Sequence, residues 1–144
     1  MYGLKISNGD FAVRGDGHVV EITGRNRIEQ ELAHWLLEPI GTDTLYARFG
    51  SRLGELIGSP MLDEYIAEVR SECGRVVQNY VEYQKRQMNE DLLKGETYFL
   101  KNWADDDIIE SVDGITVKTV ADRVRVTVKL TTAAGNRIEV AQES

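Results

Sequence analysis

The sequence predicts an α+β fold, in which short N-terminal strands precede two amphipathic helices, the second of them long, and a C-terminal antiparallel β-meander. Two patterns carry this prediction. Between residues 59 and 90, apolar residues recur at steps of three and four, which places them on one helix face. From Arg123 to Thr131, apolar and polar residues alternate without interruption, as in a strand with one buried face. We expect one domain over residues 1–144, with a β-rich segment at 1–24, a helical part at 25–104 and a sheet at 105–144.

The first 24 residues read as a small hairpin or meander of short strands. Asn8-Gly9-Asp10 and Gly15-Asp16-Gly17 are turn-forming clusters. The second cluster is not followed by a helix start with Lys-Ser/Thr, so we interpret it as a turn and not as a phosphate-binding loop. The apolar runs between the turns are Leu4 and Ile6, Phe11 and Val13, and Val19, Val20 and Ile22.

A first helix is predicted from about Arg25 to Leu37. Its apolar face consists of Ile28, Leu32, Trp35 and Leu36. Glu38-Pro39-Ile40-Gly41 ends it. A loop then carries Leu45, Tyr46 and Phe49, which we expect to tuck beneath it, and Ser51 is expected to cap a short helical turn through Leu53, Leu56 and Ile57.

The long helix is predicted from Ser59 to Glu90, with Ser59 as N-cap and Pro60 at the first helical position. Gly74, in its middle, indicates either the close approach of another backbone or a glycine with no structural role. Cys73, the one cysteine, excludes an internal disulfide and is expected to be a small buried hydrophobe. The apolar face is formed by Leu62, Ile66, Val69, Cys73, Val76, Val77, Tyr80 and Val81.

The stretch from Asp91 to Trp103 is too apolar for a free linker, yet Gly95 interrupts its periodicity. We expect either a helical hairpin or a packed excursion. After it come five acids within nine residues, which lack the glycine and the twelfth-position glutamate of a calcium loop. We therefore interpret these acids as a solvated loop or a helix N-terminus: Asp105, Asp106, Asp107, Glu110 and Asp113.

The C-terminal third predicts two to three antiparallel strands. Shorter versions of the alternating pattern run from Ile115 to Val120 and from Arg137 to Val140. Asp113-Gly114 and Ala134-Gly135-Asn136 are expected to be the turns. Neither shorter strand contains proline, so their edges are open to pairing with another strand.

Composition limits the classes of partner. A net charge of −7 argues against nucleic acid and anionic membranes, which require clustered Lys and Arg. No apolar run is long enough to span a membrane, and the first residues lack the anatomy of a signal peptide, so we expect synthesis in the cytosol. His18 and His34 fit no catalytic triad or metal-ligand spacing, and we expect no metal and no cofactor.

Several short motifs follow one another between residues 28 and 60. They are Ile28-Glu29-Gln30, Pro39-Ile40-Gly41-Thr42, Arg48-Phe49-Gly50-Ser51-Arg52-Leu53 and Leu56-Ile57-Gly58. In this order of elements the chain resembles the baseplate wedge family that initiates the tail sheath of contractile phage tails, which has members in type VI secretion baseplates and R-type bacteriocins. Those relatives carry Glu-Pro-Arg early in a long helix. The matching tripeptide here is Glu68-Val69-Arg70, with valine in place of proline.

The resemblance implies a structural protein of the virion baseplate, assembled in the host cytoplasm. It implies larger baseplate wedge proteins and the tail sheath protein as partners, then the hub or the tail tube, with six copies around the tail axis. The terminal sheet would offer strand edges to the first ring of sheath subunits. The expected partner-binding residues are Glu68 and Arg70 on the helix and Ile115, Val117, Arg123, Arg125, Lys129, Arg137, Ile138 and Val140 on the strands.

Two other functions compete with this one. Some relatives have been labelled lysozyme-like, and a glycosidase needs two carboxylates across a cleft, one of them in an apolar setting. Glu29, Glu31 and Glu38 lie on the polar face of the first predicted helix, so we predict no enzymatic activity. A stand-alone cytosolic protein-binding module is the nearer alternative, and the identity of the neighbouring genes would separate it from a baseplate protein.

Overall fold

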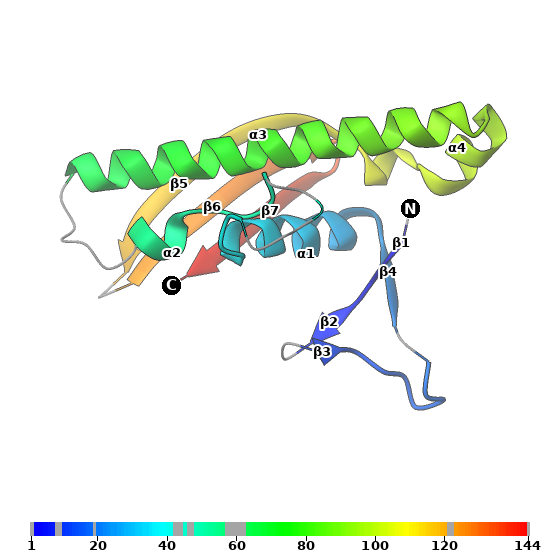
Figure 1. Cartoon of the computed structure of the whole chain (residues 1–144), viewed down its shortest axis with the longest axis horizontal. Coiled ribbons are helices and arrows are strands. Elements are labelled where there is room, and N and C mark those ends of the chain that lie inside the picture. Colours follow the sequence, from blue (N-terminus) through cyan, green and yellow to red (C-terminus); the bar gives the residue numbers. More distant parts are fainter. Residues whose placement is uncertain are drawn as a thin grey trace.

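The computed structural model has two layers, with helices α1 (Gly24–Leu37) and α3 (Asp63–Leu93) packed on one face of a three-stranded sheet (Figure 1). It confirms the predicted α+β class, with short N-terminal strands, two main helices and a C-terminal antiparallel sheet. The buried apolar side chains of both helices and of the sheet form one cluster. The structure describes residues 2–7, 10–18, 20–41, 45, 48–56, 63–120 and 123–143.

The sheet has the order β5-β6-β7, built from β5 (Ile109–Val120), β6 (Arg123–Thr132) and β7 (Arg137–Glu143). All neighbours are antiparallel. The alternation in β6 is confirmed, because its valines and Leu130 are buried against the helices while the residues between them face outward. The predicted turn is also confirmed: Gly135 has φ +83°, and Thr132 donates its N–H to the Asn136 oxygen at 2.9 Å.

The predicted turn at Asp113-Gly114 is wrong, since β5 begins at Ile109 and passes through both residues. Its pairing with β6 shifts register at two places, between Ile109 and Ser111 and between Val112 and Gly114. The turn-forming residues therefore make a bulge within a strand instead of ending it. The Asp113 carboxylate accepts hydrogen bonds from the hydroxyls of Ser111 and Thr131, which hold the bulge in place.

Helix α1 occupies almost the predicted range, and its predicted apolar face is buried. Trp35, near the C-terminal end of α1, belongs to this face. The centroid of its ring system lies 4.9 Å from that of Phe49 and 5.7 Å from that of Tyr80. Phe49 thus packs under the loop as expected. Leu45 does not, because it is 96% exposed, and Tyr46 lies outside the described residues.

Helix α3 follows the predicted apolar face, although its predicted start at Ser59 lies outside the described residues. It runs to Leu93, beyond the predicted end, and packs over β5. Among the described residues no backbone approaches Gly74 closely; a Cβ there would lie 3.9 Å from a methyl group of Ile115 in β5. A methyl group at this position would therefore make an ordinary van der Waals contact with the sheet.

Of the two alternatives for residues 91–103, the structure shows the helical hairpin. Gly95 adopts φ +120° between α3 and α4 (Glu96–Asn102), which turns back along the end of the long helix (Figure 1). The indole N–H of Trp103 then donates to the Asp91 carboxylate at 2.7 Å in a buried position. This hydrogen bond fastens the end of α4 to α3.

The N-terminal strands form a ribbon that extends away from the helices and the sheet (Figure 1). β1 (Tyr2–Leu4) pairs with β4 (Glu21–Thr23), and β2 (Ile6–Ser7) pairs with β3 (Asp10–Phe11). The turn at residues 15–17 is confirmed by the bond from Gly17 N–H to the Arg14 oxygen, at 2.9 Å. Residues 8 and 9 of the other predicted turn lie outside the described residues.

Candidate partner-binding surfaces

β7 is an open edge of the sheet. Among the described residues it pairs with β6 alone, and its register is continuous from Thr131 opposite Arg137 to Arg125 opposite Glu143. β5 forms the other edge, but its two register shifts interrupt it. Because bulges disfavour further pairing, β7 is the more regular edge for an incoming strand.

The register shows which main-chain groups of β7 face that edge. Thr132 and Asn136 are joined by a hydrogen bond at the end of the hairpin, and bonded and non-bonded pairs alternate along an antiparallel ladder. Ile138 and Val140 therefore direct their N–H and C=O groups toward β6. The residues that direct theirs outward are Arg137, Glu139, Ala141 and Glu143.

The apolar residues expected to contact partners lie on the buried face of the sheet. Val117 is 7% exposed, Ile138 2% and Val140 4%, and Ile115 packs against the same core. Their side chains pack in the core and are not exposed to a partner. Only main-chain groups of these residues are available to a partner strand, and those of Ile138 and Val140 are already used by β6.

The charged residues expected to contact partners lie on the opposite, solvated face. Arg123, Arg125 and Lys129 of β6 and Arg137 of β7 are all exposed. Arg125 forms an ion pair with Glu143 on the neighbouring strand. The helices cover the other face of the sheet, so this face is uncovered by the described part of the chain.

Glu68 and Arg70 are both exposed on α3, but they do not act together. Glu68 lines a half-open pocket of about 360 Å³ between α3 and the segment before it. Arg70 is absent from that pocket, as expected for residues two apart on a helix. The other residues that line the pocket are Arg52, Leu56, Ser71, Glu72 and Arg75.

Glu72, which the sequence analysis did not single out, is the central charge of that pocket and is only 3% exposed. Its carboxylate accepts hydrogen bonds from the Arg52 main-chain N–H at 2.9 Å and from Arg75 at 2.6 and 3.0 Å. Arg75 also donates to the Gly50 oxygen at 3.2 Å. Together these bonds fasten the loop around residues 50–52 to α3. Burial alone would raise the pKa of Glu72, but the Arg75 and Arg52 hydrogen bonds outweigh it and lower the pKa.

The loop fastened by Glu72 is the Phe49-Gly50-Ser51 segment of the resemblance. Gly50 has φ +98°, and Ser51 bonds to the end of α1, its N–H to the Glu38 oxygen at 2.7 Å and its hydroxyl to the Leu36 oxygen at 2.5 Å. The same hydroxyl accepts the Leu53 N–H at 3.3 Å at the start of α2 (Leu53–Leu56). Ser51 therefore both joins α1 and caps the short helix, as the sequence predicts.

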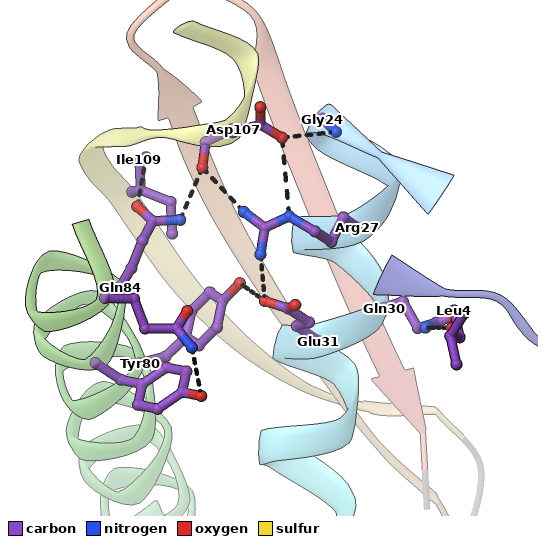
Figure 2. A network of polar contacts seen from close by, with 11 residues as sticks. Leu4, Gly24, Arg27, Gln30, Glu31, Tyr80, Gln84, Asp107 and Ile109 are labelled. Carbon is purple, nitrogen blue, oxygen red and sulfur yellow. Dashed lines mark hydrogen bonds and ion pairs between the residues drawn. The ribbon is translucent and has the colours of Figure 1, made fainter. Parts of the chain in front are cut away.

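A second missed cluster joins α1, α3 and the start of the sheet (Figure 2). Arg27, 1% exposed, donates to Glu31 at 2.8 Å and to the Asp107 main-chain oxygen at 3.2 Å. Tyr80 donates to the same Glu31 oxygen at 2.7 Å. Gln84 donates to the Asp107 oxygen and accepts the N–H of Ile109, each at 2.9 Å. Burial and the charge of Glu31 raise the pKa of Tyr80 far above its ordinary value.

For Asp107 alone, the interpretation of the acidic run as a solvated loop or a helix N-terminus is wrong. The first three acids form the short helix η1 (Asp105–Asp107), in which Asp107 is 3% exposed, whereas Glu110 and Asp113 lie in β5 and are exposed. Its carboxylate accepts the N–H groups of Gly24 and Ala104, each at 2.9 Å.

The burial of Glu72 could be predicted in part from the sequence. Glu72 follows Val69 by three residues and precedes Val76 by four, so it falls on the apolar face of the helix. For Asp107 the sequence offers only its place directly before Ile108-Ile109.

Other groups considered for chemistry are spread apart or inert. No three histidine, cysteine or acidic side chains converge as a metal site among the described residues. Burial and the charge of Glu72 raise the pKa of Cys73 to about 12, which removes the reactive thiolate near neutral pH. Of the three glutamates weighed for hydrolysis, Glu31 is bound to Arg27 and Tyr80, and Glu38 lies 3.5 Å from His34.

Comparison with known proteins adds no relative: neither the family models nor the curated proteins contain a match to this chain. Within the described residues, no helix combines the length and apolar character needed to cross a membrane.

Proposed function

We propose that this protein is a structural component of a contractile-tail baseplate, which joins the wedge and nucleates the tail sheath by offering a β-strand edge to the first sheath ring. The motifs between residues 28 and 60, which resemble those of the baseplate wedge family, are the reason for assigning the protein to a contractile tail. The observation that carries the role is the open edge of β7, which presents four outward-facing residues in one continuous register.

The mechanism is strand addition. An arm of a sheath subunit adds to β7, with main-chain hydrogen bonds supplying affinity and alternate side chains supplying register. Each bond contributes about 1 kcal/mol net, so one edge binds weakly. Six edges held at fixed spacing raise the effective concentration of each further subunit. A sheath that does not start in solution therefore starts on the baseplate.

Ala141→Pro tests this proposal. The substitution removes an outward N–H and places a ring methylene where the partner strand must approach, yet it leaves the bonds to β6 intact. We expect a folded subunit and complete wedges, but tubes without sheath by electron microscopy. Ala141→Thr, which keeps the N–H, is the matched control and should give sheathed tails. Normal sheaths on Ala141→Pro tails would show that nucleation occurs elsewhere.

Truncation after Ala134 removes β7 and with it the buried side chains of Ile138 and Val140, so it disturbs the core as well as the edge. Ile138→Pro is also less informative than Ala141→Pro, because the Ile138 N–H faces β6 and its side chain is buried, so that change disturbs the fold as well as the edge. Thermal unfolding of each isolated subunit distinguishes the two effects.

A further inference from the structure

The outer face of β7 carries a charge pattern next to the open edge. Arg125 of β6 forms an ion pair with Glu143, and Lys129 lies directly opposite Glu139 in the register. Opposite charges therefore face each other across these two strands, an arrangement that stabilises cross-strand pairs. On the other side of β7, no strand of the described residues pairs with it, so its outward-facing charges have no cross-strand neighbour there.

Arg137 and Glu139 are only weakly engaged within the sheet, Glu139 by Lys129 opposite it and Arg137 by the charge of Asp113. Both are exposed, and neither forms an ion pair within 4 Å among the described residues. Arg137 lines a half-open pocket of about 530 Å³ together with Asp113 of β5 and Lys129 of β6. Ala141, two residues after Glu139, is exposed and small, and leaves space on the same face.

We propose that these side chains select the incoming strand by charge: an antiparallel strand of another protein, with an acidic residue opposite Arg137, a basic residue opposite Glu139 and a small residue opposite Ala141. This inference rests on the proposed function, because it assumes that β7 receives a strand. It adds the chemistry of that strand and its register, since a slip by two residues sets the basic residue against Arg137.

Self-pairing fits the pattern less well. A second copy of β7, aligned antiparallel over its full length, places Arg137 opposite Glu143 but sets Glu139 opposite Ala141. The charge of Glu139 then has no counterpart on the second copy. Charged side chains along an edge also discourage pairing with unselected strands. The same residues therefore disfavour wrong partners and reward the right one.

Disulfide capture tests the inference on the full-length protein. Ala141→Cys places a thiol on the outer face of β7, and the buried Cys73 does not compete because of its high pKa and 0% exposure. Two seven-residue peptides of equal composition and charge are compared in a redox buffer of a small thiol and its disulfide, where the small disulfide is the oxidant and leaves as the thiol during exchange. They are Thr-Thr-Cys-Thr-Lys-Thr-Glu, which matches the pattern, and Thr-Thr-Cys-Thr-Glu-Thr-Lys, which opposes it.

We expect capture of the matching peptide to exceed that of the opposing peptide by roughly threefold or more, with the preference lost in high salt. Exchanging the charges on the protein, in Arg137→Glu with Glu139→Arg, should reverse the preference. Equal capture of both peptides overturns the charge selection but leaves strand addition standing, which Ala141→Pro tests separately. Capture of neither peptide, or a disulfide-linked dimer of the Ala141→Cys protein in its place, also overturns it.

Discussion

Arg27 and Asp107 lie 80 residues apart in the chain, yet Nη2 of Arg27 donates to the main-chain oxygen of Asp107 at 3.2 Å. Nε of the same arginine lies 3.8 Å from the Asp107 carboxylate. Both side chains are almost fully buried, so Asp107 and Glu31 compensate the charge of Arg27, and Arg27 compensates the charge of Asp107. The pair connects the start of α1 to the segment that leads into the sheet (Figure 2).

Asp107→Ala should therefore destabilise the protein strongly. The substitution leaves the buried Arg27 charge with Glu31 alone and removes the acceptor of two main-chain N–H groups. We expect a loss of about 3 kcal/mol in the free energy of unfolding, measured by urea denaturation. Asp105→Ala, an exposed acid in the same short helix, is the control and should change stability by less than about 0.5 kcal/mol. Equal effects of the two substitutions would contradict this account of the network.

Glu72 should make stability depend on pH. Its pKa in the folded protein is lowered, so the ionised carboxylate stabilises the fold at every pH above its ordinary value of about 4.3. That contribution is lost as the pH falls through the folded value. Glu72→Gln should cost about 1–2 kcal/mol at pH 7, and the difference from the wild-type protein should shrink below about pH 4.

Chemical denaturation across pH 3 to 7 measures this difference. Glu68→Gln, which alters an exposed carboxylate one turn earlier on α3, provides the control and should have little effect throughout. A Glu72→Gln deficit that stays constant down to pH 3 would mean that packing, and not the charge, fastens the loop.

The sequence predicted those features that depend on local periodicity. The apolar faces of α1 and α3 and the alternation of β6 follow from spacing alone, because burial of one face imposes that spacing. The failures concern positions where a distant contact decides. Asp113-Gly114 has turn chemistry, but the length of β6 extends the pairing past it and converts the turn into a bulge.

For the candidate sites, too, local patterns could be predicted from the sequence, and features that depend on distant contacts could not. The exposed charges of β6 could be assigned from the strand pattern, and β7 could be placed next to them by its turn. That β7 is the regular edge required the register of the whole sheet. Glu72 and Asp107 were missed because their burial depends on partners 20 to 83 residues away, such as the N–H groups of Arg52 and Gly24.

Gly50 should tolerate no side chain. A Cβ at this position would lie 2.5 Å from the Glu38 oxygen and 2.9 Å from Pro39, in addition to the strain of φ +98°. Gly50→Ala must therefore displace the end of α1 and weaken the Ser51 bond to Glu38. We expect a loss of about 3 kcal/mol in the free energy of unfolding.

Gly41→Ala separates the two causes of that loss. Gly41 also has a positive φ, +86°, but a Cβ there meets no atom of the described residues within 4 Å. Its substitution should cost about 1 kcal/mol, the backbone strain alone. Similar losses at both positions would mean that steric contact at Gly50 contributes little.

Arg70 provides the test of α3 as a wedge contact. Its side chain is exposed and lies outside the pocket around Glu72, so Arg70→Glu should leave the isolated subunit folded, with thermal stability close to that of the wild-type protein. If Arg70 is desolvated against an acidic group of a larger wedge protein, charge reversal there costs several kcal/mol of binding. Incorporation into baseplates, measured by sedimentation and gel analysis, should then fall sharply.

Lys85→Glu makes the same charge change at another exposed position of α3 and should leave incorporation unchanged. Glu68→Lys reverses the charge at the pocket and should weaken incorporation independently of Arg70, because the two side chains meet different partner groups. Baseplates that incorporate Arg70→Glu as readily as the Lys85→Glu control would remove Arg70 from the wedge interface and leave Glu68 and the edge of β7 as the candidate contacts.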